Sequence, residues 1–197
     1  MPQFRNYVTI VSGLPRSGTS MMMQILQAGG MPILSDGVRE PDPDNPRGYF
    51  EFELVKKLAT TRHWMPNAIG KAVKIVHALL PSLPIGFQYR VILMRRHILE
   101  VAASQRVMLE RSGKTGANLP DERLAQLFTA DLENTIAWVK QNPACRLLEV
   151  EHRQCLTQPA QIAATLNRFL SHEGDANRLD EAKMIAAIDA SLYRQRI

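Results

Sequence analysis

The segment GLPRSGTS, residues 13–20, combines glycine, hydroxyl and arginine residues at a spacing that is typical of phosphate-binding loops. It follows an apolar run at 7–12 and precedes MMMQILQ at 21–27, so a strand, a tight loop and a helix are expected in that order. The unpaired N–H groups and the positive dipole end of such a helix attract an anion. The chemistry predicted for this segment is therefore phosphate binding.

The side chains of the loop strengthen that prediction. Gly18 lets the backbone approach a phosphate closely, and Arg16 offers a planar set of N–H donors that suits oxyanions. A simpler interpretation is a structural turn in which Ser17 only caps the helix, but the flanking strand and helix favour phosphate. The residues expected to contact the ligand are Pro15, Arg16, Ser17, Gly18, Thr19 and Ser20.

The loop lacks the lysine that nucleoside-triphosphate-binding loops place before their final Ser or Thr, because Gly18 is followed directly by Thr19. That lysine reaches the β- and γ-phosphates, and an Asp on another strand helps to hold magnesium. No apolar strand of this sequence ends in Asp. These differences predict a ligand without a γ-phosphate and without an obligatory metal.

A second candidate anion site lies in VILMRRHILEVAASQ, residues 91–105. Arg96 follows a strand, and Ser104 lies eight residues later on the helix expected next. A guanidinium and a hydroxyl placed in this way can clamp one phosphate. Side chains alternate along a strand, so Arg95 and Arg96 should point to opposite sides. Considered alone, Arg96 would fit a surface ion pair, and Ser104 would fit a helix residue packed among small neighbours. Because the phosphate-binding loop is also present, we interpret Arg96 and Ser104 as a pair that binds a second phosphate.

With both sets of residues, the sequence resembles the sulfotransferases that use 3′-phosphoadenosine 5′-phosphosulfate (PAPS), in particular the small sulfotransferase-like proteins of bacteria. PRSGTS at 15–20 is similar to their 5′-phosphosulfate loop, P-[KR]-S-G-T-[ST], and Arg96 with Ser104 resembles the pair that binds the 3′-phosphate. The resemblance extends over about residues 7–160, including DNPRGYFEFE at 44–53. It implies a nucleotide-binding transferase that moves a sulfuryl group from PAPS to a hydroxyl or amine, on a small-molecule or carbohydrate acceptor, without a metal.

The resemblance also suggests residues for sulfuryl transfer, which needs a cation near the bridging oxygen and a base for the acceptor. Arg16 occupies the position at which the family has a Lys or Arg near the leaving phosphate. Thr19 and Ser20 occupy the positions whose side chains hold the 5′-phosphate in the family. KIVHALLP is similar to the family's K-T-H-L-P with one extra residue. Lys74 is therefore expected near the transferring group, and His77 is one candidate base.

Two carboxylates, Glu51 and Glu53, are the alternative bases, since some carbohydrate sulfotransferases use a Glu. Simpler interpretations stay open for all three residues: His77 also fits a histidine bonded to backbone at a strand end, and the two carboxylates also suit the start of a helix. No C-terminal R-K-G segment is present to close over adenosine, so adenine contacts are unassigned, and acceptor contacts are expected from 31–50 and 113–120. The remaining histidines are interpreted as structural: His63, His97, His152 and His172.

The elements that must position these residues alternate along the chain. Alternation of this kind predicts parallel βαβ units, an α/β fold with a three-layer P-loop-type sandwich around a central parallel sheet, and a single domain over 1–197. Ligands of such sheets bind beyond the carboxyl ends of the strands. Strands are expected at 7–12, 72–77, 89–94 and 146–150, helices at 18–28, 51–60, 97–111, 121–140, from 158 to about 170 and at 180–190, and a long loop at 31–50.

Composition narrows the function classes. The net charge of +5 suits a site for a small polyanion, although scattered, solvated charge is the simpler explanation of the number, and 6% aromatic residues do not favour nucleic-acid binding. The sequence contains no run of eighteen apolar residues, so no membrane span is predicted. Two cysteines without metal or disulfide spacing suggest a reduced, cytoplasmic protein. Two other functions stay open: a small-molecule or nucleotide kinase with a degenerate loop, and a non-catalytic nucleotide-binding protein.

Overall fold

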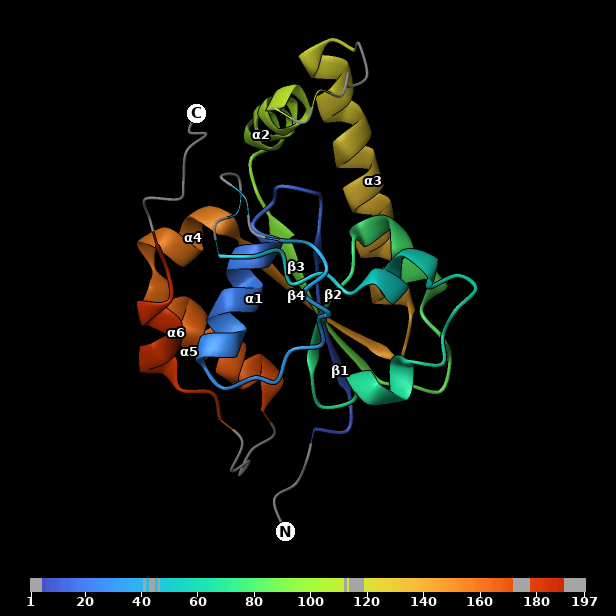
Figure 1. Ribbon diagram of the computed structural model, residues 1–197, viewed down its shortest axis with the longest axis vertical. Helices are drawn as coiled ribbons and strands as arrows, with labels where there is room; N and C mark the ends of the chain where they lie inside the picture. The colour runs from blue at the N-terminus through green and yellow to red at the C-terminus, as the bar shows by residue number, and fades with distance from the viewer. Residues whose placement is uncertain are drawn as a thin grey trace.

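The computed structural model describes residues 5–40, 42, 45, 47–111, 113, 119–171 and 178–189. Within these residues, one parallel sheet lies at the centre of the fold (Figure 1), and its strand order is β2-β1-β3-β4. Its register places Val11 of β1 opposite Lys74 of β2 and Ile92 of β3. The predicted α/β fold with a central parallel sheet is confirmed. The strands are β1 (Val8–Gly13), β2 (Ala72–Lys74), β3 (Tyr89–Arg95) and β4 (Cys145–Glu151).

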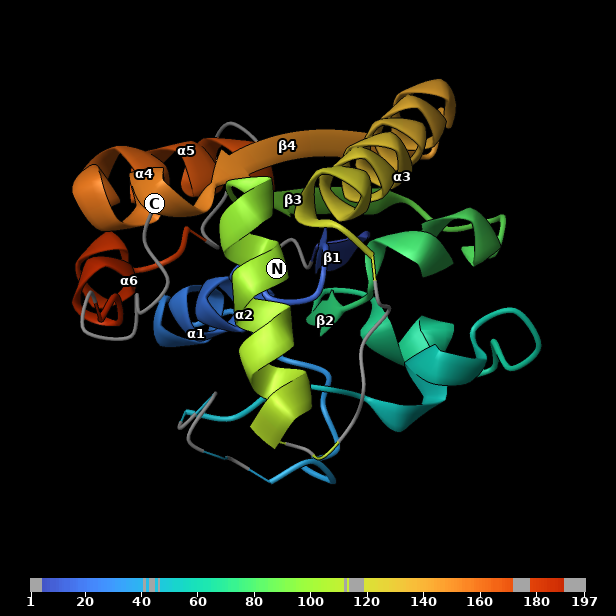
Figure 2. The same cartoon turned by 90° about the horizontal axis from the view of Figure 1, so that it is seen from above.

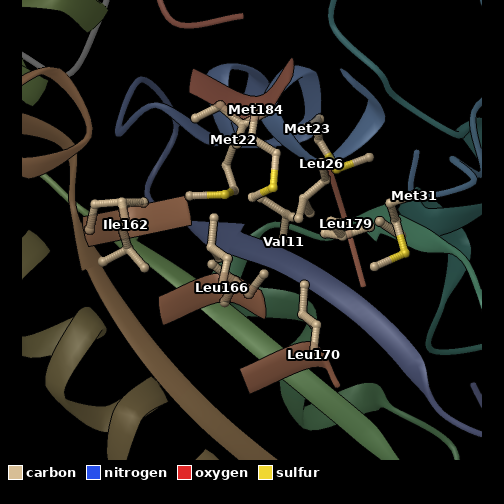
Figure 3. Packing of buried hydrophobic residues seen from close by; sticks show 14 of the residues in the cluster. Val11, Met22, Met23, Leu26, Met31, Ile162, Leu166, Leu170, Leu179 and Met184 are labelled. Carbon is tan, nitrogen blue, oxygen red and sulfur yellow. The ribbon is translucent and has the colours of Figure 1, made fainter. Parts of the chain in front are cut away.

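Helices α1 (Thr19–Ala28), α5 (Pro159–Leu170) and α6 (Glu181–Ala186) cover one face of the sheet. The apolar residues of α1 are spaced to form one stripe, which packs on Val11 and against α5 and α6 (Figure 3). Burial of this stripe fixes α1, and with it the loop before α1, against the sheet. The buried residues labelled there are Val11, Met22, Met23, Leu26, Met31, Ile162, Leu166, Leu170, Leu179 and Met184.

The opposite face is covered by the C-terminal part of α3 (Asp121–Gln141) and by three short 3₁₀ helices, η1 (Glu53–Lys57), η2 (Met65–Ala68) and η3 (His77–Ser82). Figure 2 shows the sheet between the two layers. Helix α2 (Ile98–Arg111) packs against α3 and lies beyond the carboxyl ends of the strands (Figure 1). The predicted binding edge of the sheet is therefore bordered by α2.

Several predicted elements differ from the structure. The helix expected at 51–60 is wrong in type, because residues 53–57 form the 3₁₀ helix η1. Phe52, Val55 and Leu58 recur every three residues, and that spacing fits the three-residue turn of a 3₁₀ helix. β2 ends at Lys74 rather than at 77, so His77 begins η3.

At the C-terminal side, the helix α4 (His152–Thr157) directly follows β4 and was not predicted. The last helix covers 181–186 rather than 180–190. No helix within the described ranges is long and apolar enough to cross a membrane.

Candidate functional site

A cavity of about 640 Å³ opens at the carboxyl ends of the strands. Its walls come from the residues after β1, β2, β3 and β4, as expected for the binding edge of a parallel sheet. Among the described residues, five cationic side chains and two carboxylates line the cavity, and this excess of positive charge favours a polyanionic ligand. The cations are Arg16, Arg39, Lys56, Lys74 and Arg96, and the carboxylates are Glu51 and Asp189.

The predicted phosphate loop joins β1 to α1 at this edge. Gly18 is the N-cap of α1 with φ 100°, a left-handed conformation that favours glycine, and no side chain caps the helix. A Cβ on Gly18 would lie 2.6 Å from Cδ2 of His152, so glycine is required sterically as well. Thr19, Ser20 and Met21 of the first helical turn line the cavity. The start of α1 thus presents the backbone N–H groups of a helix N-terminus to the cavity.

The second predicted anion site lies against this loop. Nε of Arg16 donates to Oγ of Ser104 at 3.0 Å, and Nη1 of Arg96 donates to the Arg16 carbonyl at 3.2 Å. Gln105, next to Ser104 on α2, donates to the Pro15 carbonyl at 3.1 Å. We call residues 13–20 together with Arg96 and Ser104 the anion cradle. The loop 13–20 and Arg96 are more than seventy residues apart in the sequence, and the fold brings them into hydrogen-bond contact.

Arg95 and Arg96 lie on opposite sides of the chain, as the alternation of a strand predicts. Arg95 is exposed and pairs with Glu149 at 2.8 Å and with Glu151 at 3.6 Å. Arg96 pairs with Glu100 at 2.8 Å, and both of these side chains are nearly buried, at 10% and 6% exposure. The ion pair offered as the simpler interpretation of Arg96 is thus present, but it lies in the cavity wall rather than on the surface.

Lys74 enters the cavity from the end of β2. Its Nζ donates to the Tyr49 carbonyl at 2.6 Å and to Oγ of Ser20 at 3.2 Å, and lies 3.9 Å from Oε1 of Glu51. Burial lowers the pKa of Lys74 to about 8, and the Glu51 carboxylate opposes part of that shift. Lys74 is therefore a cation beside the phosphate loop that loses its charge at mildly alkaline pH.

Of the two candidate carboxylates, only Glu51 lines the cavity among the described residues. Its Oε1 accepts from Nη1 of Arg39 at 2.8 Å. Glu53 instead pairs with Lys56 at 2.5 Å on a more exposed part of η1. The two glutamates, equivalent in the sequence, are thus separated by the structure.

His77 is buried in η3 and is not part of the described cavity wall. Its Nδ1 lies 3.3 Å from the Gly13 carbonyl. Burial lowers the pKa of His77, and the contact with Gly13 works in the opposite direction. This position matches the simpler interpretation, a histidine bonded to backbone beside a strand end.

One wall of the cavity is formed by a segment that we call the strap, the described residues between 36 and 53. It closes on itself, because the Asp36 N–H donates to the Glu51 carbonyl at 3.2 Å and the Glu53 N–H donates to Oδ2 of Asp36 at 2.6 Å. Asn45 crosses to the anion cradle, where its Nδ2 donates to Oγ of Ser20 at 2.9 Å. From the segment 31–50, Arg39, Asn45 and Tyr49 line the cavity, and their contact with an acceptor stays a prediction. Most of 113–120 lies outside the described residues.

Tyr49 is the best-packed residue of the strap, with 5% exposure. Its hydroxyl donates to the Asp42 carboxylate, at 2.7 and 2.8 Å from the two oxygens, and the Arg39 guanidinium lies 3.3 Å from the centre of its ring. Burial, followed by the bond to Asp42, raises the pKa of Tyr49 to about 12. Tyr49 lies within the stretch 44–53 that carries the resemblance, but nothing in the sequence pointed to a role for its side chain.

The strap is also attached to the C-terminal part of the chain. Arg47 donates to the Ala187 carbonyl and to Oδ2 of Asp189, both at 2.8 Å. Asp189 in turn lines the cavity. Residues just after α6 therefore hold the strap in place.

His152, interpreted from the sequence as structural, lies in the cavity wall beside Gly18. It is 7% exposed. Nothing in the spacing of the sequence marked it, because the six-residue helix that begins there leaves no periodic pattern. β3 and β4 end at the paired residues Arg95 and Glu151, so His152 lies at the same edge of the sheet as the loop that it contacts.

No protein-family model matches this sequence, and no curated protein matches it. Among solved structures, a sulfotransferase domain from the curacin biosynthetic pathway superposes with a TM-score of 0.53 at 15% identity, over 98% of this chain and 80% of that chain. The chain shares the fold of that domain. An identity this low shows the fold alone.

Two further structures are less similar. Retinol dehydratase in complex with androsterone and the inactive cofactor PAP has a TM-score of 0.48 at 15% identity, over 95% of this chain and 64% of that chain. An unliganded sugar kinase from Janibacter has a TM-score of 0.46 at 16% identity, over 85% of this chain and 99% of that chain. We draw no functional conclusion from either.

Proposed function

We propose that this protein is a sulfotransferase that moves the sulfuryl group of PAPS to a hydroxyl or amine acceptor. The observation that carries the proposal is the contact between the two halves of the anion cradle. The Arg16–Ser104 and Arg96–Arg16 hydrogen bonds join the two sets of groups that are predicted to bind anions, at one edge of the sheet. A nucleotide with separate 5′ and 3′ anionic groups matches that arrangement.

The residues present fit the phosphates of such a ligand. The uncapped start of α1, with the hydroxyls of Thr19 and Ser20, would hold the 5′-phosphate, and Arg96 with Ser104 would hold the 3′-phosphate. The hydroxyl of Ser17 is buried inside the loop against Gly13, and Ser17 is not part of the cavity wall among the described residues. No group of three or more His, Cys, Asp or Glu within the described residues is arranged to hold a metal ion.

Lys74 and Glu51 are the residues we assign to the transfer step. When bound, PAPS supplies an electrophilic sulfuryl group on an anionic phosphate leaving group. Lys74, hydrogen-bonded to Ser20 of the loop, would stabilise the negative charge that develops on the bridging oxygen. Glu51, 3.9 Å from Lys74 on the same wall, would take the proton that the acceptor loses as its oxygen or nitrogen bonds to sulfur. We assign His77 no part in this step.

A thermal-shift experiment with adenosine 3′,5′-bisphosphate (PAP) tests the proposal. At about one hundred times the dissociation constant, PAP without magnesium should raise the melting temperature by about 5–10 °C. Arg96→Ala should abolish most of that shift, because it removes the guanidinium from the cavity wall. Arg95→Ala is the matched control, since Arg95 points to the other side and pairs only with exposed carboxylates in the described structure.

Three outcomes would contradict the proposal. Stabilisation by ATP with magnesium and not by PAP would favour a kinase. Equal loss of the shift in both arginine variants would place the ligand outside the anion cradle. Equal affinity for PAPS and PAP, with no transfer to any acceptor in a panel of alcohols, phenols, sugars and amines, would indicate a non-catalytic nucleotide-binding protein.

A further inference from the structure

His152 lies where three strand ends meet. β3 and β4 pair as far as Arg95 and Glu151, so Arg96 and His152 are the next residues beyond the ends of two neighbouring strands. On its other side, Cδ2 of His152 approaches Gly18 so closely that a Cβ there would lie 2.6 Å away. Gly18, Arg96 and His152 all line the cavity. The imidazole is therefore part of the wall between the phosphate loop and the guanidinium assigned to the second phosphate.

The charges around His152 come from Arg96 and from Glu100 on α2, which act on its ring in opposite directions. Burial and then Arg96 lower the pKa of His152 to about 4, so its imidazole is neutral at physiological pH. A neutral imidazole beside Arg96 avoids the repulsion that a second buried cation would add. An anion bound between the loop and Arg96 would reverse this balance, because it would favour the imidazolium form.

We propose that His152 is an additional anion-binding residue of the cradle, and that it takes up a proton when a phosphate or sulfate dianion binds beside Gly18 and Arg96. The proposal rests on the proposed function only for the identity of the physiological ligand; the binding of a dianion at the cradle is sufficient for it. Its consequence is that ligand affinity changes with pH through a protein group, and not only through the phosphates of the ligand.

The experiment is a pH titration of the histidine ring signals by NMR, with the His152 signal assigned from His152→Gln. PAP and inorganic sulfate are the two probes. Sulfate stays a dianion over the whole range, so any proton taken up with it belongs to the protein. Saturating either probe should raise the pKa of His152 by about one unit or more. The exposed His63 is the internal reference, and its signal should not move.

Calorimetry gives the matching thermodynamic readout. At about pH 4.5, between the pKa of about 4 in the free protein and the raised value, sulfate binding to the unmodified protein should show proton uptake when two buffers of different ionisation enthalpy are compared. His152→Gln, which keeps an N–H donor but cannot be protonated, should lose that uptake. His63→Gln should keep it, as a substitution of an exposed histidine away from the cavity.

The outcomes separate this inference from the proposed function. If PAP binds and the pKa of His152 stays unchanged, the sulfotransferase proposal survives and the inference is wrong. If PAP does not bind, the experiment with sulfate tests the inference on His152 by itself. That inference is wrong if the His152 signal does not move at saturating sulfate, or if no sulfate binding is detected. Equal proton uptake in the unmodified protein and in His152→Gln would assign the proton to another group.

Discussion

Most residues of the anion cradle and several of the strap line the same cavity, but the two regions are built differently. The cradle consists of residues at the ends of β1 and β3, on the first turn of α1 and on the second turn of α2, so its geometry is set by the sheet and by the buried stripe of α1. The strap has no helix or strand before Glu53, and its position depends on side-chain bonds through Asp36, Asn45 and Tyr49. This difference indicates a cradle that is held rigidly by the sheet and a strap whose position can adjust.

The largest expected effect is in the cradle, at Gly18. Gly18→Ala should weaken PAP binding by about a hundredfold, because the new methyl group meets His152 at a left-handed φ of 100° and must displace the loop or the ring. Isothermal titration calorimetry measures this loss. Gly30→Ala is the matched control, since Gly30 also has a positive φ, 93°, but nothing lies within 4 Å of its Cβ position.

The Gly30 variant should lose about 1 kcal/mol of stability from backbone strain and keep its affinity for PAP. A Gly18→Ala protein that binds PAP as tightly as the Gly30→Ala protein would show that the loop is not the rigid half of the site.

A smaller effect is expected where the two regions meet, at Lys74. The pKa of Lys74 is lowered to about 8, so its ammonium is charged below that pH and neutral above it. PAP affinity should therefore fall as pH rises through about 8, by up to about tenfold. Lys74→Arg should remove this alkaline decline, because a guanidinium keeps its charge. An unchanged decline in the arginine variant would assign it to a different group.

The smallest effect is expected in the strap itself, at Tyr49. Tyr49→Phe keeps the ring under Arg39 but removes the hydroxyl that bonds to Asp42, so it should destabilise the strap by about 1 kcal/mol. The KM for the acceptor should rise about fivefold, while the affinity for PAP should change less than about twofold. Steady-state kinetics with PAPS measure the KM for the acceptor, and calorimetry measures the affinity for PAP. A change of equal size in both constants would mean that strap and cradle act as one unit.

The sequence allowed the cradle to be predicted because each of its parts follows a strand with a recognisable apolar run. Once β1 and β3 are adjacent and parallel, the loop after Gly13 and the side chain of Arg96 must lie at the same edge. The hydrogen bond between Arg16 and Ser104 follows from that placement. The roles of these residues toward a ligand are still predictions.

The strap and His152 could not be predicted in the same way. The strap has no periodicity, and its contacts with Ser20 and Lys74 join residues whose separation depends on the complete fold. His152 begins a helix of six residues, too short to leave a pattern. The sequence also could not predict which of Glu51 and Glu53 lines the cavity. Glu51 precedes the 3₁₀ helix η1 and pairs with Arg39, whereas Glu53 begins η1 and pairs with Lys56.

If this protein is the sulfotransferase proposed above, the bond between Arg47 and the residues after α6 has a consequence for how its preferred acceptor could change. A substitution near Ala187 or Asp189, far from the strap in the sequence, would alter how firmly that wall is fastened while leaving both anion sites intact. Selection could therefore retune which alcohols or amines are admitted through the last described residues of the chain, at no cost to nucleotide recognition.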